Sequence, residues 1–444
     1  MDNLAFVKLP MKPIGELSAE GFFESGLEYN TPARGMWNIV HTGMLVPGAH
    51  QIFACAEGCL RGVILTAAEM LALDRLSWIS VSEEDMGNGT LESDIVDGVS
   101  EIIGKLSART PFVPKPRVIL LYLSCIHLFA GVDFDAILDE LSGRFPDIAF
   151  VDCYMTPTMR TTVTPVAKMA QQLYAALKPL PLNKRSVSII GNDRATDPDS
   201  ELVRIIRQNG FKLRDITLCQ NFGEYLQMAE SAINITYLPT AVPAGDSLAE
   251  RFGAEHLHLP AAFDYDLLEA NYARLCVALG VFVPDFTEDK AAADKALDKA
   301  RETVGDVPIA IDFTAVSRPF ELAELLAAHG FNVRHIIADT AATEREAFER
   351  LKACCPDIMV YAAANVNMLN ICREPHGEVL AIGQKAAYYF ATDNFVNIVM
   401  NAGLYGFAGI KKLAALMENA FLCKKDRKTV ISHKGFGCAS CLNS

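Results

Sequence analysis

Three cysteines stand beside small residues in two short segments and could hold a redox centre. Cys55 and Cys59 lie four residues apart in the segment 51–62, and Cys125 follows an apolar run that stops at Ser124. Thiolates are the usual ligands of iron–sulfur clusters, and small neighbouring residues let backbone amides reach the sulfur atoms. These cysteines are therefore predicted to lie at one redox site, with ordinary buried cysteine as the alternative.

A second group of possible metal ligands stands near the end of the sequence. Cys423, His433, Cys438 and Cys441 include one C-x2-C pair beside glycines, which is half of a zinc or iron–sulfur site. The pair could instead be a redox dithiol, or the segment could be a frayed tail. Cys438 and Cys441 are kept as predicted metal ligands.

The weaker candidates are residues whose neighbours do not complete a site, and no catalytic residue is predicted. They are His127 near the redox site, Cys153 as a residue that could line a cavity, His256 and His258 as a metal-binding pair, and Arg160 and Arg373 as cations for an anionic substrate.

Length and composition limit the class of protein. The chain has 444 residues, 12 cysteines and a formal net charge of −14. This length predicts two or three domains, and the acidic balance argues against nucleic acid as a partner. Because the chain starts without a secretory signal and has no apolar run that could span a membrane, we expect a cytoplasmic protein with no membrane partner. There the cysteines predict metal binding, redox work or burial rather than disulfides.

Strands and helices alternate in three rounds along the chain. The first round contains an amphipathic helix at 91–106, an apolar strand at 117–124 and a further helix at 133–142. The second begins with a strand at 186–191, and the third follows an alanine-rich helix at 287–303. The pattern predicts an α/β fold of three doubly wound, parallel-sheet, Rossmann-like domains.

We expect the domains at 1–180, 181–304 and 305–420, followed by a cysteine-containing tail at 421–444. The first of them would open with an irregular arm and carry the cluster cysteines. Ligands of such sheets bind beyond the carboxyl ends of the strands, where Cys125, Leu238 and Asp312 are expected. No Walker A loop or dinucleotide fingerprint is present, so a standard ATP or NAD loop is not expected.

Segments of this sequence resemble, in order, motifs of the nitrogenase component 1 superfamily. The superfamily includes the nitrogenase molybdenum–iron protein, the dark-operative protochlorophyllide reductases and the F430-biosynthesis reductive cyclase. Residues 52–59 resemble its His-Gly-Pro-x-Gly-Cys segment, 82–85 its Thr-Glu-x-Asp segment, and 124–135 its Thr-Cys…Ile-Gly-Asp-Asp segment. Residues 403–410 resemble the glycine–aromatic start of a late helix, so the resemblance covers about residues 30–420 and implies the same three-domain fold.

In that superfamily each subunit gives cysteines to a cluster at the interface of two related subunits. The resemblance places Cys59 and Cys125 at two ligand positions and implies a 4Fe-4S or larger P-cluster-like iron–sulfur cluster. Where the family has its first ligand cysteine, this sequence has Met36, and a thioether is a poor ligand. Cys55 is therefore predicted to supply the missing thiolate, with Glu57 as an oxygen alternative.

The resemblance implies a catalytic-component subunit of a nitrogenase-like oxidoreductase. Such a subunit pairs with a homologous subunit, as a homo- or hetero-oligomer, and receives electrons from an ATP-dependent iron–sulfur reductase protein. The two nitrogenase cofactor ligands would fall near Leu238 and Asn401, which cannot replace them. A substrate other than dinitrogen is therefore expected. A metallocluster assembly scaffold and a cluster-free structural subunit paired with a paralogue are the alternatives.

Overall fold

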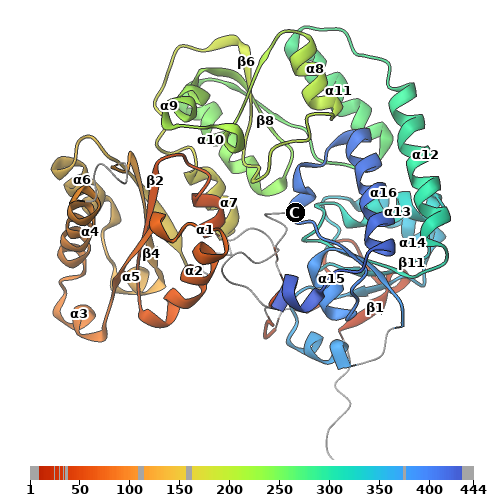
Figure 1. The fold of residues 1–444 in the computed structure, drawn as a ribbon, viewed down its shortest axis with the longest axis horizontal. Helices are drawn as coiled ribbons and strands as arrows, with labels where there is room; N and C mark the ends of the chain where they lie inside the picture. Colours follow the sequence, from red (N-terminus) through yellow and green to blue (C-terminus); the bar gives the residue numbers. More distant parts are fainter. Residues whose placement is uncertain are drawn as a thin grey trace, which may run out of the picture.

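The computed structural model describes residues 10–24, 26–29, 31–33, 35, 39–108, 115–156, 163–373 and 377–432. Three separate sheets make up the molecule, each built mainly from parallel strands and flanked by helices (Figure 1). The predicted α/β class with Rossmann-like sheets is confirmed. Within the described ranges, no helix has both the length and the apolar character needed to cross a membrane.

The first sheet has the strand order β3-β2-β4-β5 and is parallel throughout. Its strands are β2 (Ala49–Cys55), β3 (Leu76–Ser80), β4 (Val118–Ser124) and β5 (Ala149–Met155). Every residue of β4 is buried, because helices cover both faces of the sheet. Alternate side chains point to opposite faces, so Phe53 and Tyr122 stack on one side while Ile52 and Leu121 pack on the other.

The helices of this domain divide between the two faces, with α1, α2 and α7 on one side and α4 and α6 on the other (Figure 1). Their bounds are α1 (Ile39–Gly43), α2 (Glu57–Glu69), α3 (Glu83–Asn88), α4 (Leu91–Ala108), α5 (Cys125–Ala130), α6 (Phe134–Arg144) and α7 (Pro165–Gln172). Ser82 caps α3 and forms a capping box with Asp85, which satisfies two free amides.

The second sheet has the order β7-β6-β8-β9 and is also parallel. Its strands are β6 (Asn183–Ile189), β7 (Lys212–Asp215), β8 (Ser231–Thr236) and β9 (Glu255–His258), and its helices are α8 (Glu201–Gln208), α9 (Phe222–Leu226), α10 (Val242–Phe252) and α11 (Tyr265–Leu279). Strands β7 and β8 lie on opposite sides of β6, so the strand order reverses there. Ligands of doubly wound sheets bind at such a point.

The third sheet has six strands in the order β1-β12-β11-β10-β13-β14. Its parallel strands are β10 (Ile309–Asp312), β11 (Val333–Ile337), β12 (Met359–Tyr361), β13 (Leu380–Ile382) and β14 (Phe395–Val396). The accompanying helices are α12 (Thr287–Val304), α13 (Pro319–Ala328), α14 (Arg345–Cys354), α15 (Gln384–Tyr389) and α16 (Gly406–Leu422). The long helices α12 and α16 pack side by side along the outer side of this domain (Figure 1).

Part of the expected irregular arm is instead a strand of the third sheet. Strand β1 (Met11–Pro13) pairs antiparallel with β12, and its proline is tolerated because the strand lies at the sheet edge. The prediction of an irregular arm belonging to the first domain is therefore wrong for residues 11–13. Three residues are too few for a periodic pattern, so only the tertiary pairing reveals the strand. The divisions near residues 180 and 304 stay a proposal.

Candidate functional site

The three cysteines predicted to bind a cluster lie at the carboxyl edge of the first sheet. Cys55 ends β2, and Cys125 begins α5 directly after β4. Strands β2 and β4 are neighbours, with Ala54 opposite Leu123, so these two strand ends lie side by side. Cys59 stands in the first turn of α2, which starts two residues after β2 ends. The fold therefore gathers at one edge two segments that are far apart in sequence.

The environments of these cysteines differ. Cys55 is fully buried in the core between β2 and α2, and burial, together with the neighbouring Cys59, raises the pKa of Cys55 to about 12. Cys59 is exposed and Cys125 is partly exposed. The thiols of Cys59 and Cys125 are therefore accessible, whereas the Cys55 thiol is buried in the core and protonated.

This set of thiols fits half of an iron–sulfur site. Among the described residues, no group of three or more histidine, cysteine, aspartate or glutamate side chains is arranged to hold a metal ion. A cubane cluster takes four thiolates, so the two accessible cysteines could supply half of the ligands and a second chain the others. Glu57, the oxygen alternative, is exposed at the start of α2.

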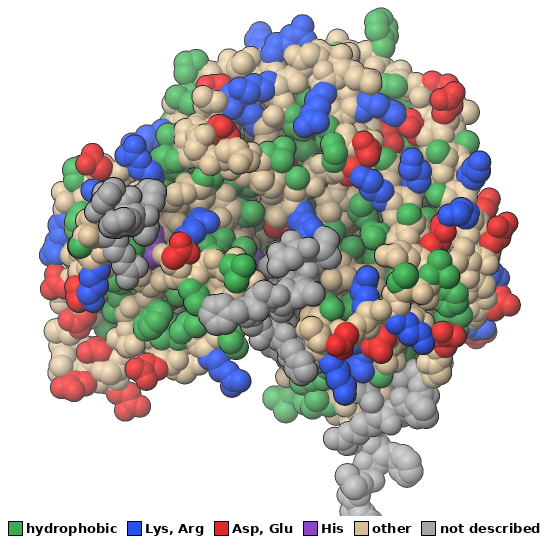
Figure 2. Space-filling model, viewed as in Figure 1, with side chains coloured by type: hydrophobic (Ala, Val, Ile, Leu, Met, Phe, Trp, Pro, Cys, Tyr) green, Lys and Arg blue, Asp and Glu red, His purple; other side chains and the backbone are tan. Residues whose placement is uncertain are grey.

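Helix α5 presents apolar side chains next to Cys125. Leu128 is 62% exposed and Phe129 is 75% exposed, although side chains of this size are normally buried. Hydrophobic side chains gather on this part of the first domain, around α2 and α5, in Figure 2. An exposed apolar patch beside two accessible thiols is typical of a surface that another protein covers.

His127 lies under this surface and anchors α5. Its Nδ1 accepts a hydrogen bond from the Ser124 amide at 3.1 Å, and burial lowers the pKa of His127. Because Nδ1 is an acceptor, the ring carries its proton on Nε2, a buried atom without a hydrogen-bond partner among the described residues. A role for His127 beside a cluster stays a prediction.

Several of the other predicted candidates lie outside the described part of the chain. Met36, Arg160, His433, Cys438 and Cys441 fall there, as does the side chain of Arg373. Cys423 is exposed just after α16. Cys153 is buried in β5, where burial raises the pKa of its thiol.

A second group of candidate residues was not predicted from the sequence and follows β6 in the second sheet. Asn192 Oδ1, Asp193 Oδ2, Arg194 Nη2 and Asp197 Oδ2 are buried and have no hydrogen-bond partner among the described residues. Buried polar atoms without partners are rare and commonly mark bound water or a ligand. Burial raises the pKa of Asp193 well above its usual range. The sequence signal that could have indicated this site is the occurrence of Asp193 and Arg194 shortly after the end of β6.

A left-handed stretch of backbone lies near this edge. Met400, Asn401, Ala402 and Gly403 have φ angles of 48°, 61°, 49° and 79°, which is costly for the three residues that are not glycine. The third domain holds the stretch in place, because Asn401 donates its amide to Ala315 O at 2.8 Å and accepts from the Ser317 amide at 2.9 Å. Such strain is commonly kept where a functional site needs it.

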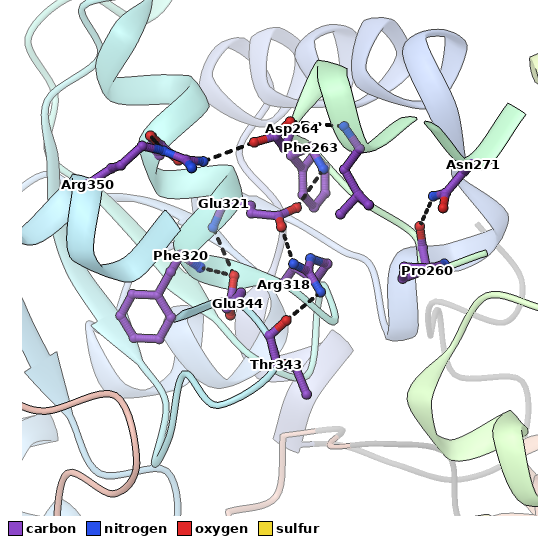
Figure 3. A network of polar contacts seen from close by, with 12 residues as sticks. Pro260, Phe263, Asp264, Asn271, Arg318, Phe320, Glu321, Thr343, Glu344 and Arg350 are labelled. Atoms are coloured by element: carbon purple, nitrogen blue, oxygen red, sulfur yellow. Dashed lines mark hydrogen bonds and ion pairs between the residues drawn. The ribbon is translucent and has the colours of Figure 1, made fainter. Parts of the chain in front are cut away.

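A buried network of charged residues joins the second and third domains (Figure 3). Glu321 on α13 is paired with Arg318 and accepts the Phe263 amide at 3.1 Å. Glu344 accepts the amides of Phe320 and Glu321, both at 2.9 Å. Burial, reinforced by Glu321, raises the pKa of Glu344 to about 8 although these amides and Arg318 oppose the shift.

The network predicts a pH dependence of stability. The pKa of Glu344 rises from 4.5 to about 8 on folding, so the folded protein binds the extra proton between these values. The protonated Glu344 therefore makes its full contribution to the free energy of unfolding below about pH 4.5. This contribution falls by about 1 kcal/mol per pH unit as the pH rises toward 8. In urea denaturation at pH 5 and pH 8, Glu344→Gln is expected to reduce this loss. Parallel pH profiles of the variant and wild type would contradict the assignment.

Three mainly parallel sheets, with accessible thiols at one carboxyl edge and buried polar atoms without partners at another, define an α/β protein whose sheet edges are candidate ligand sites. The family model for nitrogenase component 1 type oxidoreductases matches residues 42–422. The chain belongs to this family, and the resemblance inferred from its sequence is confirmed.

Solved structures of nitrogenase have the same fold. The structure described as "Nitrogenase Cp1 at pH 6.5" is 13% identical, with a TM-score of 0.67 over 90% of this chain and 94% of the other. "Nitrogenase Cp1 at pH 5" is 12% identical, with a TM-score of 0.59 over 93% of each chain. At this identity the likeness shows the fold alone. No curated protein matches the chain.

Proposed function

We propose that this chain is the catalytic-component subunit of a nitrogenase-like oxidoreductase. It would work with a homologous subunit and receive electrons from an ATP-dependent iron–sulfur reductase. The observation that carries the proposal is a pair of accessible cysteines after neighbouring strands, Cys59 in the first turn of α2 behind β2 and Cys125 directly after β4, both within the matched residues 42–422. A 4Fe-4S or larger iron–sulfur cluster bound there would supply one-electron transfer.

The residues around these cysteines have defined roles in the proposal. Cys59 and Cys125 each donate one thiolate to the cluster. The homologous subunit covers Leu128 and Phe129, which removes their apolar surface from water and shields the thiolates from solvent. Cys55 could join as a third ligand only by losing its proton and leaving the core. The C-terminal Cys438 and Cys441 stay proposed ligands of a separate site.

The substrate is proposed to bind at the carboxyl edges of the second and third sheets. The buried polar atoms of Asn192, Asp193 and Arg194 support a polar or charged organic substrate at this edge. Leu238 and Asn401 are buried where the resemblance expects the nitrogenase cofactor ligands, and the Asn401 side chain is engaged by the Ser317 amide. These residues favour a substrate other than dinitrogen.

Iron binding tests the proposal directly. The full-length protein is purified without oxygen, and iron, sulfide and electron paramagnetic resonance are measured for wild type, Cys59→Ala and Cys125→Ala. About two irons per chain are expected for one four-iron cluster shared by two chains, and each variant should lose nearly all of this iron. Cys354→Ala is the matched control, because Cys354 is also exposed but lies at the end of α14; it should keep the iron.

The other outcomes select between the alternatives. Wild-type protein that stays iron-free when produced with a homologous subunit and an iron–sulfur assembly system would favour a structural subunit. Iron that is bound but transferred to an acceptor protein, without reduction by an ATP-dependent reductase, would favour an assembly scaffold. Retention of iron by both Cys59→Ala and Cys125→Ala would move the site elsewhere on the chain.

A further inference from the structure

A continuous chain of hydrogen bonds crosses the second domain. Asp246 Oδ1 on α10 lies 2.7 Å from His256 Nδ1, and His256 Nε2 lies 2.8 Å from Thr236 Oγ1. The same threonine oxygen lies 3.0 Å from His258 Nδ1. Four side chains from α10, β8 and β9 are thus linked end to end by three short contacts.

The register of the two strands explains how these residues meet. Strands β8 and β9 are parallel neighbours, with Thr236 opposite His258 and Asn234 opposite His256. His256 and His258 are two residues apart on one strand, so both rings lie on the face that Thr236 shares. The alternation in His256-Leu257-His258 therefore brings both imidazole rings to the Thr236 hydroxyl. Among the described residues, no group of side chains is arranged to hold a metal ion.

Helix α10 is built to allow this contact. Gly245 lies inside α10, where glycine costs about 1 kcal/mol relative to alanine. A side chain at this position would overlap the His256 imidazole. The glycine therefore lets the helix close over the ring and brings Asp246 to its Nδ1 atom.

The hydrogen-bonded chain runs from the exposed Asp246, through the fully buried Thr236, to His258, which is partly exposed at the carboxyl edge of the sheet. Asp246 is 67% exposed, the His256 side chain is 10% exposed, and Thr236 is fully buried. His258 ends β9 at the carboxyl edge, close to Arg274 of α11 and Arg318 of the third domain. The Asp246 end meets water, and the His258 end lies at the carboxyl edge of the second sheet, the edge at which Asn192 and Asp193 follow β6.

The chemistry of the groups sets the direction of the hydrogen bonds. A carboxylate only accepts, so His256 carries a proton on Nδ1 and its Nε2 accepts from the Thr236 hydroxyl. Thr236 has one proton to donate, so its oxygen accepts from His258 Nδ1–H and His258 Nε2 is left with a free lone pair. All three bonds then point the same way, toward solvent.

We propose that Asp246, His256, Thr236 and His258 form a proton relay between solvent and the carboxyl edge of the second sheet. A proton added to the chain rests on His256 as an imidazolium beside Asp246. The Thr236 hydroxyl then donates to His258 Nδ1, and His258 carries its proton on Nε2. The relay thus has two states: in the state with the extra proton, the hydrogen bonds of Thr236 point in the opposite direction from those in the state without it.

Discharge of the relay conserves protons. His258 releases its Nε2 proton to a base at the sheet edge, namely the reduced substrate of the proposed function. Thr236 then passes its proton to His258 Nδ1, and His256 passes its Nε2 proton to Thr236. His256 is then neutral, and the chain has lost the one proton that the base gained. Recharging takes one proton from water at the Asp246 end. The His256 proton moves from Nδ1 to Nε2 and the new proton binds Nδ1, while the Thr236 hydroxyl rotates toward His258 and His258 changes from the Nδ1–H to the Nε2–H tautomer.

The surroundings of His258 favour release of its proton. Burial lowers the pKa of His258, and His256, Arg274 and Arg318 lower it further, while the Thr236 carbonyl opposes the shift. Reductions consume protons together with electrons, so the use of this relay in catalysis rests on the proposed function. The relay itself is a property of the isolated chain.

Nitrogen-15 NMR of the histidine rings in the full-length protein tests the relay. Of the nine histidines in the sequence, His256 and His258 are assigned with His256→Gln and His258→Gln. At high pH both rings are expected as the Nδ1–H tautomer, and protonation of His256 on acidification should shift the ring nitrogens of His258. Thr236→Val keeps the side-chain shape but lacks the hydroxyl, so it should abolish this coupled shift, whereas Thr236→Ser should keep it.

A variant at the exposed Asp246 provides a second test in case Thr236→Val does not fold. Asp246→Ala removes the exposed acceptor, so His256 should lose its preference for the Nδ1–H tautomer and the His258 ring should shift with it. A His258 ring that titrates identically in wild type, Thr236→Val and Asp246→Ala would overturn the relay. Failure of the proposed function is distinguishable, because an iron-free protein can still show coupled rings, and uncoupled rings can accompany full iron content.

Discussion

Replacing Glu321 by alanine is expected to lower the free energy of unfolding by about 3 kcal/mol or more. The Glu321 carboxylate is buried, pairs with Arg318 and accepts the Phe263 amide across the junction of the second and third domains (Figure 3). Without it, Arg318, whose side chain is 13% exposed, loses its ion-pair partner and keeps the bond to Thr343 O at 2.7 Å and the more distant charge of Glu344. A buried charge without its partner is among the most costly defects a core can carry.

Urea denaturation of the purified protein measures this effect. Glu324→Ala is the matched control, because Glu324 lies on the same helix and pairs with Arg350, which is 47% exposed. A pair at the surface contributes at most about 1 kcal/mol. Relief of the repulsion between Glu321 and Glu344 offsets part of the loss, and the pKa of Glu344 should fall in Glu321→Ala. Equal stabilities of the two variants would show that the network does not hold the domains together.

Replacing Gly406 by alanine is expected to destabilise the protein by about 3 kcal/mol. Gly406 starts α16 with a φ of 74°, and a Cβ atom there would overlap the Tyr272 hydroxyl and a carboxylate oxygen of Glu201. These groups cannot easily move apart, because Tyr272 donates to Glu201 Oε2 at 2.8 Å and the Ala408 amide donates to Oε1 at 3.1 Å. The substitution therefore adds steric overlap to backbone strain at a buried site.

Gly210→Ala separates the two contributions. Gly210 has the same φ of 74°, but a Cβ atom there would meet no other atom within 4 Å. The control should therefore lose only the cost of the left-handed conformation, about 1 kcal/mol. Thermal or urea unfolding compares the two variants, and a loss at Gly406 no larger than that at Gly210 would mean that α16 shifts to accept the side chain.

Periodic hydrophobic patterns made most of the fold predictable. The apolar run at 117–124 became the buried strand β4, and the amphipathic segment at 91–106 became α4. Strand β1 could not be predicted in the same way, because its three residues become a strand only by pairing with β12, which lies about 350 residues further along the chain. The buried polar residues Asn192, Asp193 and Arg194 were missed, since a strand end followed by polar residues usually continues as a solvated loop.

The sequence by itself determined the family, the alternation of strands and helices, and the segments that carry Cys59 and Cys125. These depend on residue types and local spacing, which remain readable without coordinates. Only the tertiary structure decided which thiols are accessible, because Cys55 and Cys59 are four residues apart yet one faces the core and the other faces solvent. It also decided that His256 and His258 share the Thr236 hydroxyl, since that contact depends on the register of two parallel strands and on the close approach of α10 at Gly245.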